Sequence, residues 1–249
     1  MTAPTAAPPF SLGVASFDPL RERVLLWTRL DEPAPCRWEV ARDAAFAQVI
    51  ASGDVDADPG TGVVSIDADG LPPGTELWYR FTSAGASSPV GRTRTLADGG
   101  AERMRIGATC CARYGQSDFT VYGALARHEV DLVVHLGDYI YEDTKVDSGD
   151  RKPDPPHDCV TLDDYRTRHA QARRDPDLQA LHARHPMVVV WDDHDFADNA
   201  WRGGAKSHDE DDQGPWSQRR AAAMQAHQEF LPKRLHDPAD LSTPFRVRS

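Results

Sequence analysis

Three nearly continuous apolar runs constrain the fold of this chain more than any other feature of its sequence. They are MRIGATC at 104–110, DLVVHLGDY at 131–139 and MVVVWDDHD at 187–195. A strand with one solvated face alternates apolar and polar residues, whereas a strand covered on both faces of a parallel sheet is apolar almost throughout. The runs therefore predict neighbouring parallel strands that are buried on both faces.

Helical segments separate the three runs. Residues 117–130 follow the first run, and residues 161–174 and 175–185 lie between the second and the third. Strand, helix and strand in this order predict a parallel sheet with right-handed crossovers. A further helix is predicted over 217–235, and PFRVRS at 244–249 has the pattern of a strand that is just beginning.

Capping signals mark where two of these helices begin. A Ser or Asp at a helix start accepts hydrogen bonds from the first N–H groups, so we expect Ser117 or Asp118 to cap the first helix. That helix should carry three apolar residues inward, namely Val121, Ala124 and Leu125. Thr161 and Asp164 have the spacing of a capping box, which predicts the start of the second helix.

Up to about residue 98 the chain follows a different pattern, in which short β-rich segments alternate with turn signals. The Pro-Pro-Gly turn at 72–74 precedes an aromatic strand, as in fibronectin-like β-sandwiches. We therefore expect an all-β domain, a fibronectin- or immunoglobulin-like sandwich, over residues 1–98, and a partial α/β domain over residues 103–249. The strand candidates of the first domain are 24–30, 36–43, 62–70, 76–85 and 90–96.

Composition narrows the class of protein. With 39 acidic and 28 basic residues the formal net charge is -11, which argues against nucleic acid as a specific partner and against an anionic membrane. No secretory signal is visible and no stretch approaches the roughly 18 apolar residues of a membrane span. The sequence as written predicts a cytoplasmic protein, or a periplasmic or secreted one if its start is incomplete. The four cysteines include no CxxC zinc pair.

Ligand-type side chains follow all three predicted parallel strands. Ligands of open α/β sheets bind beyond the carboxyl ends of the strands, so these side chains should meet at one edge. Acids packed so closely repel one another unless a cation offsets their charge. Thiolate, phenolate and carboxylate donors suit an iron ion beside hard divalent cations, and paired cations can clamp both oxygens of a displacement at phosphorus. The side chains are Cys110, Asp138, Tyr141, Asp192, Asp193 and His194.

Other interpretations exist for single residues. His194 can cap, pair with Asp138, bind a metal or protonate a leaving group, and its acidic neighbours favour the last two roles. A cysteine at a strand end is more often a small buried hydrophobe than a ligand. The remaining histidines, including those of LHARHP, are predicted to lie at the surface. The acidic run at 207–214 is predicted to be a solvated loop, because it lacks the spacing of a calcium-binding loop.

Two long motifs carry a family resemblance. HLGDYIYED at 135–143 and WDDHDFADNAWRGG at 191–204 resemble the metal-binding motifs of the alkaline phosphatase D family of metallophosphoesterases. FSLGVASFDP followed by VLLWTRL resembles the opening of that family's N-terminal β-sandwich. GATC before a helix resembles its cysteine-bearing first core strand.

The resemblance implies metal-dependent hydrolysis of phosphate mono- or diesters, with iron and calcium as cofactors. CCARYGQSDF holds an extra residue compared with the family's loop, so Cys111 is an alternative to Cys110, although the strand pattern favours Cys110. His194 is expected beside the phosphate, with Asn199 nearby. The implied metal ligands are Cys110, Asp138, Tyr141 and Asp193.

The resemblance also implies strands beyond PFRVRS that would bring a late aspartate and histidine to the metals. Three parallel strands alone would leave apolar edges open. An alternative interpretation is therefore a non-catalytic remnant, or half of a split enzyme that needs a second chain to complete its sheet. A calcium-binding adhesion module is a third, less supported possibility, because the first half has no acid cluster.

Overall fold

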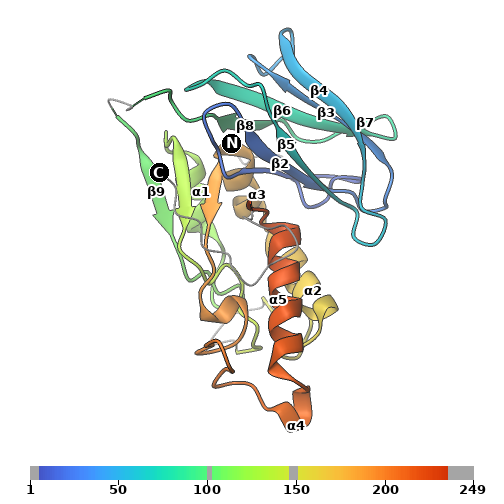
Figure 1. The fold of residues 1–249 in the computed structure, drawn as a ribbon, viewed down its shortest axis with the longest axis vertical. Helices are drawn as coiled ribbons and strands as arrows, with labels where there is room; N and C mark the ends of the chain where they lie inside the picture. Colours follow the sequence, from blue (N-terminus) through green and yellow to red (C-terminus); the bar gives the residue numbers. More distant parts are fainter. Residues whose placement is uncertain (1–5, 100–102, 146–150, 235–249) are drawn as a thin grey trace. The chain divides into compact units, whose positions relative to one another are not determined.

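The computed structural model describes residues 6–99, 103–145 and 151–234, and Figure 1 shows its helices and strands. It divides into two compact units. The first comprises residues up to 109 together with 119–135 and 173–188, and the second comprises 110–118, 136–172 and the residues from 189 onward. The strand predicted at PFRVRS and residues 146–150 of the proline-rich loop lie outside the described residues.

The first unit is rich in β-structure, and its described strands form two sheets. One sheet has the strand order β5 (Val63–Ala68), β2 (Val24–Arg29), β1 (Val14–Phe17), β11 (Met187–Val189), β10 (Leu132–His135) and β9 (Ile106–Thr109). The other has the order β4 (Val49–Asp56), β3 (Pro35–Ala41), β6 (Glu76–Ser83) and β7 (Ala86–Ser87), with β8 (Gly91–Arg94) also paired to β6.

The first sheet is mixed. β1 pairs with β2 in antiparallel and with β11 in parallel orientation, and β9 pairs with β10 in parallel. β1 was not predicted, and it joins strands from both halves of the sequence. It also covers one edge of the three predicted parallel strands. The edge at β11 is therefore not open, in contrast to the expectation.

The strand segments predicted within the described residues are confirmed, but one burial prediction is wrong. β6 alternates between half-buried and buried positions along its whole length, as its sequence predicts. β9 is the outermost strand of its sheet, and its Ile106 is 55% exposed, so β9 is not buried on both faces. An apolar run therefore does not distinguish a central strand from an edge strand.

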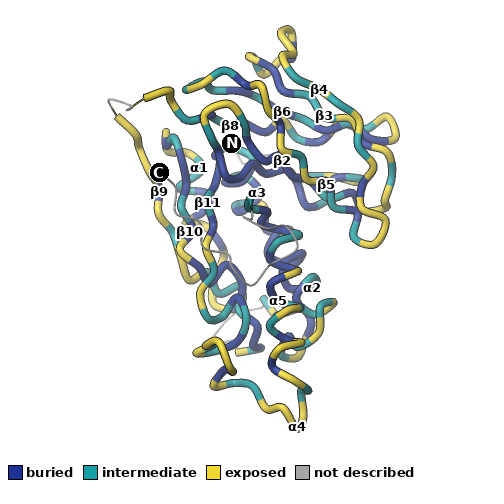
Figure 2. The backbone as a smooth tube through the Cα atoms, in the orientation of Figure 1, coloured by how far each residue is buried: buried dark blue, intermediate teal, exposed yellow. Residues whose placement is uncertain are grey.

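The core of the first unit lies between its two sheets and appears dark blue in Figure 2. Val24 and Leu26 of β2 and Val64 of β5 come from one sheet, and Val40 and Leu77 come from the other. All of these side chains are at most 1% exposed. Burying a Val or Leu side chain stabilises a fold by about 1.5–3 kcal/mol, so this layer is a main source of stability.

Helix α1 (Thr120–Ala126) differs from its prediction. Phe119 precedes it in place of a polar cap, and Val121 is 64% exposed while Tyr122 and Gly123 are buried. The inward face of the helix therefore carries Tyr122 and Gly123 in place of Val121. Gly123 lies against Asp177, where a Cβ atom would come within 2.0 Å of that carboxylate, so α1 approaches α3 (Pro176–Arg184) through a residue without a side chain.

The predicted capping box begins α2 (Leu162–Arg173). The Thr161 N–H donates to Asp164 Oδ2 at 2.8 Å, and the Asp164 N–H donates to Thr161 Oγ1 at 3.3 Å. α5 (Trp216–Phe230) runs beside α2 in Figure 1, and Arg166 pairs with Glu229 between them. The acidic run forms the short helix α4 (Glu210–Gln213), where a loop was predicted. None of the described helices is both long and apolar enough to cross a membrane.

The prediction that the remaining histidines lie at the surface is wrong for most of them. Their rings occupy inward positions, where His169 stacks on Tyr139 and on Phe230 and where His182 packs on Phe17. Burial favours the neutral ring and lowers the pKa of His135 to about 4. The histidines with at most 1% exposure are His135, His169, His182, His185 and His227.

Candidate active site

Two chain segments of the second unit form the candidate site, one following β10 and the other following β11. Gly137 has a φ of 103°, and a Cβ atom there would lie 2.5 Å from the Asp192 nitrogen, so only glycine allows the two segments to approach this closely. Asp138 also has a left-handed φ, of 51°. A non-glycine residue in that region is strained, and such strain concentrates at functional sites.

The Asp195 carboxylate fixes the two segments to each other. Its Oδ2 accepts the N–H groups of Asp138 and Asp192, both at 2.9 Å. Its Oδ1 accepts the N–H groups of Tyr139 at 3.0 Å and Ile140 at 3.3 Å. Burial raises the pKa of Asp195 to about 7, and the backbone donors oppose that rise. The sequence analysis did not single out Asp195, because its role depends on these backbone partners.

A short 3₁₀ helix (Asp193–Asp195) presents two of the predicted site residues. Asp192 caps this helix by accepting the Asp193 N–H at 2.9 Å. The His194 N–H donates to Asp138 Oδ1 at 3.2 Å. Potential ligand atoms of Asp138, Asp193 and His194 all lie within 4.8 Å of one another, as a shared cation requires.

Tyr141 and Cys111 extend this cluster. The Tyr141 hydroxyl donates to Asp138 Oδ2 at 2.9 Å, and the Cys111 thiol is close enough to interact with both Tyr141 and Cys110. The Cys111 N–H donates to the Gly137 carbonyl at 3.2 Å, which holds the cysteine next to the Asp138 segment. The Cys111 thiol therefore belongs to the surroundings of Tyr141. The assignment of Cys110 as the thiolate ligand stays a prediction, with Cys111 as its alternative.

The electrostatics of the cluster favour a cation. Burial raises the pKa of Asp138, and Asp193 adds to the rise, although the Tyr141 hydroxyl and His194 oppose it. Burial and the Asp138 carboxylate raise the pKa of Tyr141, and burial together with Cys110 and Asp138 raises that of Cys111 to about 11. These groups disfavour one another's anionic forms, and a bound cation would reverse that preference.

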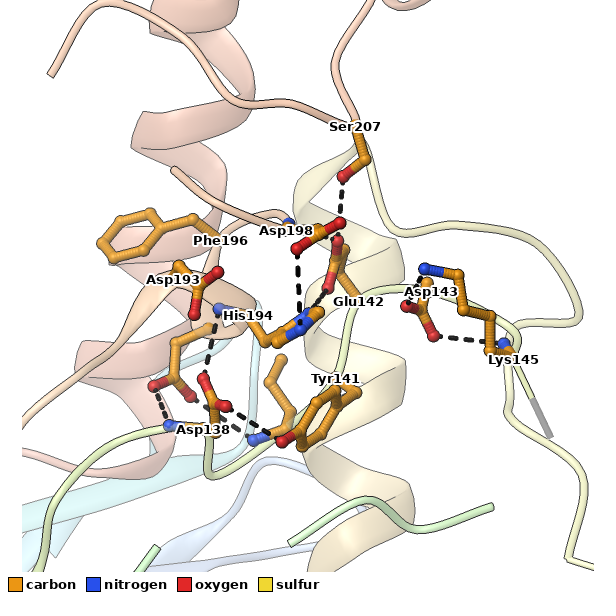
Figure 3. A network of polar contacts seen from close by, with 12 residues as sticks. Asp138, Tyr141, Glu142, Asp143, Lys145, Asp193, His194, Phe196, Asp198 and Ser207 are labelled. Atoms are coloured by element: carbon orange, nitrogen blue, oxygen red, sulfur yellow. Dashed lines mark hydrogen bonds and ion pairs between the residues drawn. The ribbon is translucent and has the colours of Figure 1, made fainter. Parts of the chain in front are cut away.

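His194 pairs with an acid that the sequence analysis did not select. Its Nδ1 lies 2.7 Å from Glu142 Oε2, and Figure 3 shows this contact at the centre of a polar network. Burial alone lowers the pKa of His194, but Glu142, Asp138 and Asp193 outweigh that effect and raise it above its usual range. Glu142 follows Asp138 by four residues, and the sequence contains no signal that would pair it with His194.

Asn199 lies at the edge of the cluster and is exposed. Its N–H donates to Asp193 Oδ2, and its side-chain amide donates to Asp198 Oδ1 at 2.7 Å. Asn199 has a left-handed φ of 54°. Its backbone is therefore coupled to a predicted ligand, whereas its side chain contacts Asp198.

A second acidic group, formed by Glu142, Asp143 and His194, is a poorer cation site. Asp143 already pairs with Arg113 and lies 3.4 Å from the Lys145 ammonium. Glu142 already accepts hydrogen bonds from the Asp198 N–H and the Ser207 hydroxyl. The group around Asp138 is therefore the better candidate for a metal.

Two arginines support the site-bearing segments. The Arg113 guanidinium lies 3.9 Å from the centre of the Tyr141 ring, at cation–π distance. Arg168 is 3% exposed, and its guanidinium donates to the main-chain carbonyls of Tyr141, Asp143, Asp154, Pro155 and His157. Such contacts to carbonyls leave no motif in the sequence.

Family models match the chain on both sides of the predicted linker. A model described as PhoD-like phosphatase matches residues 106–247, and one described as PhoD-like phosphatase, N-terminal domain, matches residues 2–97. The chain belongs to the PhoD-like phosphatase family. The resemblance found in its motifs is thereby confirmed.

Individual relatives agree with this family assignment. The PhoD-like chain is 40% identical over 247 residues to alkaline phosphatase D of Bacillus subtilis (strain 168), covering 91% of this chain and 42% of that protein. A solved structure of PhoD matches with a TM-score of 0.85 and 39% identity, over 94% of this chain and 48% of the other. The chain thus spans less than half the length of these two relatives.

A more distant structure shares the fold. Purple acid phosphatase PPD1 from yellow lupin seeds matches with a TM-score of 0.55 over 90% of this chain and 41% of its own. The identity is only 10%, so this likeness concerns the fold alone.

Proposed function

We propose that this PhoD-like chain carries the site of a metal-dependent phosphoric ester hydrolase that acts on phosphate mono- or diesters. The observation that carries this proposal is the meeting of the Asp138 and Asp193 carboxylates, the Tyr141 phenol and a cysteine thiol beside the His194 ring. Membership of the PhoD-like phosphatase family supports the same reaction class.

The donor set fits iron together with calcium. Asp138, Tyr141 and Asp193 would hold the ions together with Cys110 or its alternative Cys111. Phenolate and thiolate suit iron, and carboxylates suit both ions. Bound metal ions would supply Lewis-acid stabilisation of the charge that develops on phosphate oxygens. The raised pKa values of Asp138 and Tyr141 support this fit, because a bound cation would replace the proton that each acid holds, and that proton would leave to solvent.

His194 would act on the leaving group. Its ring is only partly exposed, it lies beside Asp138 and Asp193, and its pKa is raised, so it can hold the proton that a leaving oxygen needs. The Asn199 backbone orients Asp193, and its exposed side chain is proposed to contact the substrate phosphate.

We also propose that residues 1–98 form the N-terminal β-sandwich domain and that residues 103–249 form a C-terminally incomplete metallophosphoesterase domain. The two-sheet core of residues 10–81 supports the first assignment. A second chain that completes the sheet stays a prediction.

Replacing Asp138 with Asn tests the proposed site. The amide removes the charge that binds cations but keeps the shape, so we expect at least a hundredfold loss of metal-dependent ester hydrolysis with little change in thermal stability. Asp209→Asn is the matched control, since Asp209 only caps α4. Full activity of the Asp138→Asn variant would refute the assignment.

A further inference from the structure

Glu142 occupies an unusual position for an acidic side chain. It is 0% exposed, and its Oε2 lies 2.7 Å from His194 Nδ1. Its Oε1 accepts the Asp198 N–H at 2.7 Å and the Ser207 hydroxyl at 3.2 Å. A buried carboxylate is strongly unfavourable unless donors compensate for the lost water, and these groups provide that compensation.

The contact determines which nitrogen of His194 holds its proton. A carboxylate oxygen only accepts, so the Nδ1 atom must donate to Glu142. The other nitrogen, Nε2, lies 4.0 Å from Asp198 Oδ1, which is beyond hydrogen-bond distance. Nδ1 is therefore held in place, while Nε2 is left for a reacting group.

We propose that Glu142 is a positioning residue for His194, holding the Nδ1 proton so that the Nε2 proton faces the leaving oxygen. This inference rests on the proposed phosphoester hydrolysis. As a water oxygen bonds to phosphorus and loses a proton to solvent, the bond from phosphorus to the leaving oxygen breaks. Its electron pair stays on the leaving oxygen, which takes the Nε2 proton. The His194 ring is then neutral. Its remaining proton stays on Nδ1, which still donates to Glu142.

A purely structural role is the competing explanation, because Glu142 also links the segments that carry Asp198 and Ser207. The two roles differ in how they depend on the substrate. Protonation matters most for a poor leaving group, whereas a general distortion of the site slows all substrates alike.

The test compares phenyl phosphate, which has a poor leaving group, with p-nitrophenyl phosphate, which has a good one. In the Glu142→Gln variant, one amide oxygen has to accept from both the Asp198 N–H and His194 Nδ1. The hydrogen bond from Nδ1 is then lost, or the amide nitrogen donates to Nδ1 instead. We expect the variant to slow the phenyl ester by about tenfold more than the p-nitrophenyl ester, since general-acid catalysis contributes about 10²–10⁴-fold. The double variant that combines Glu142→Gln with His194→Ala should be no slower than the single variant His194→Ala.

Ser207→Ala is the matched control, because it removes another contact to the same carboxylate but leaves the His194 contact. It should slow both esters equally. Equal slowing of both esters by Glu142→Gln, or additive effects of Glu142→Gln and His194→Ala, would overturn the proposal.

A second measurement needs neither a variant nor turnover. Nitrogen-15 NMR of the metal-free wild-type chain, at an alkaline pH where the ring is neutral, identifies the protonated nitrogen of His194. A proton on Nδ1 supports the role of Glu142, and a proton on Nε2 alone overturns it. If the wild-type chain hydrolyses neither ester, the proposed function fails, and this spectrum still decides whether Glu142 holds the proton of His194 on Nδ1.

Discussion

The Asp195 carboxylate offers the sharpest test of how the site is built. Asp195→Asn preserves the size of a side chain that is 1% exposed, so it creates no cavity. An amide has one oxygen, whereas each carboxylate oxygen of Asp195 now accepts two backbone N–H groups. In one orientation the amide nitrogen faces the buried N–H groups of Tyr139 and Ile140, and in the other it faces the buried N–H of Asp138 and the part-buried N–H of Asp192, and these donors lose their acceptor.

The size of the effect follows from that count. A buried donor left unsatisfied costs about 1–3 kcal/mol, and the amide takes the less costly orientation, so the variant should lose at least about 1–3 kcal/mol of stability. That is a large share of the roughly 5–15 kcal/mol that stabilises a typical domain. Urea unfolding at constant pH measures the loss, and hydrogen exchange at the Asp138, Tyr139 and Ile140 amides localises it.

Asp192→Asn is the matched control, because Asp192 is exposed and its side chain caps the 3₁₀ helix, a role that Asn can also fill. Asp and Asn are similar caps, so this variant should change stability by less than about 1 kcal/mol. Equal stability of the Asp195→Asn and Asp192→Asn variants, or unchanged exchange at the three amides, would refute the argument.

Two further variants test other buried groups. Arg168→Met removes the hydrogen bonds to several carbonyls and should lower the free energy of unfolding in urea by about 2–4 kcal/mol. Its control, Arg166→Met, breaks a partly exposed ion pair and should lower it by less than about 1 kcal/mol. Equal losses in the two variants would contradict this. The pKa of His135 falls from 6.5 when unfolded to about 4 in the fold, so stability should decline by about 3 kcal/mol as the pH drops through that window. His135→Gln should lessen this decline, and an unchanged slope would refute the contribution of His135.

Much of the fold could be predicted from local sequence patterns. Apolar runs, alternation and the capping box at Thr161 depend on neighbours in the chain, so they located α2 and most of the described strands, but not β4 or β7. β1 was missed because its four residues obtain their place from β2 and β11, which the sequence separates widely. Whether His169 and His182 point inward depends on how their helices pack. The sequence alone showed only that histidine is polar, and the surface position predicted from that was wrong.

The candidate site was predictable only in part. The motifs pointed to Asp138, Tyr141 and Asp193, because acids at successive strand ends need a common explanation. Asp195 and Glu142 lie in the same motifs, but their roles arise from backbone donors and a ring that only the folded chain brings to them.

The measurement that tests the central claim most directly is the metal content of the purified chain by plasma mass spectrometry, made together with a phosphoester assay on the same sample. The account predicts bound iron and calcium, and ester hydrolysis that is lost when the metals are removed and restored when they are returned. A folded chain that binds neither metal and hydrolyses no phosphate ester would contradict it.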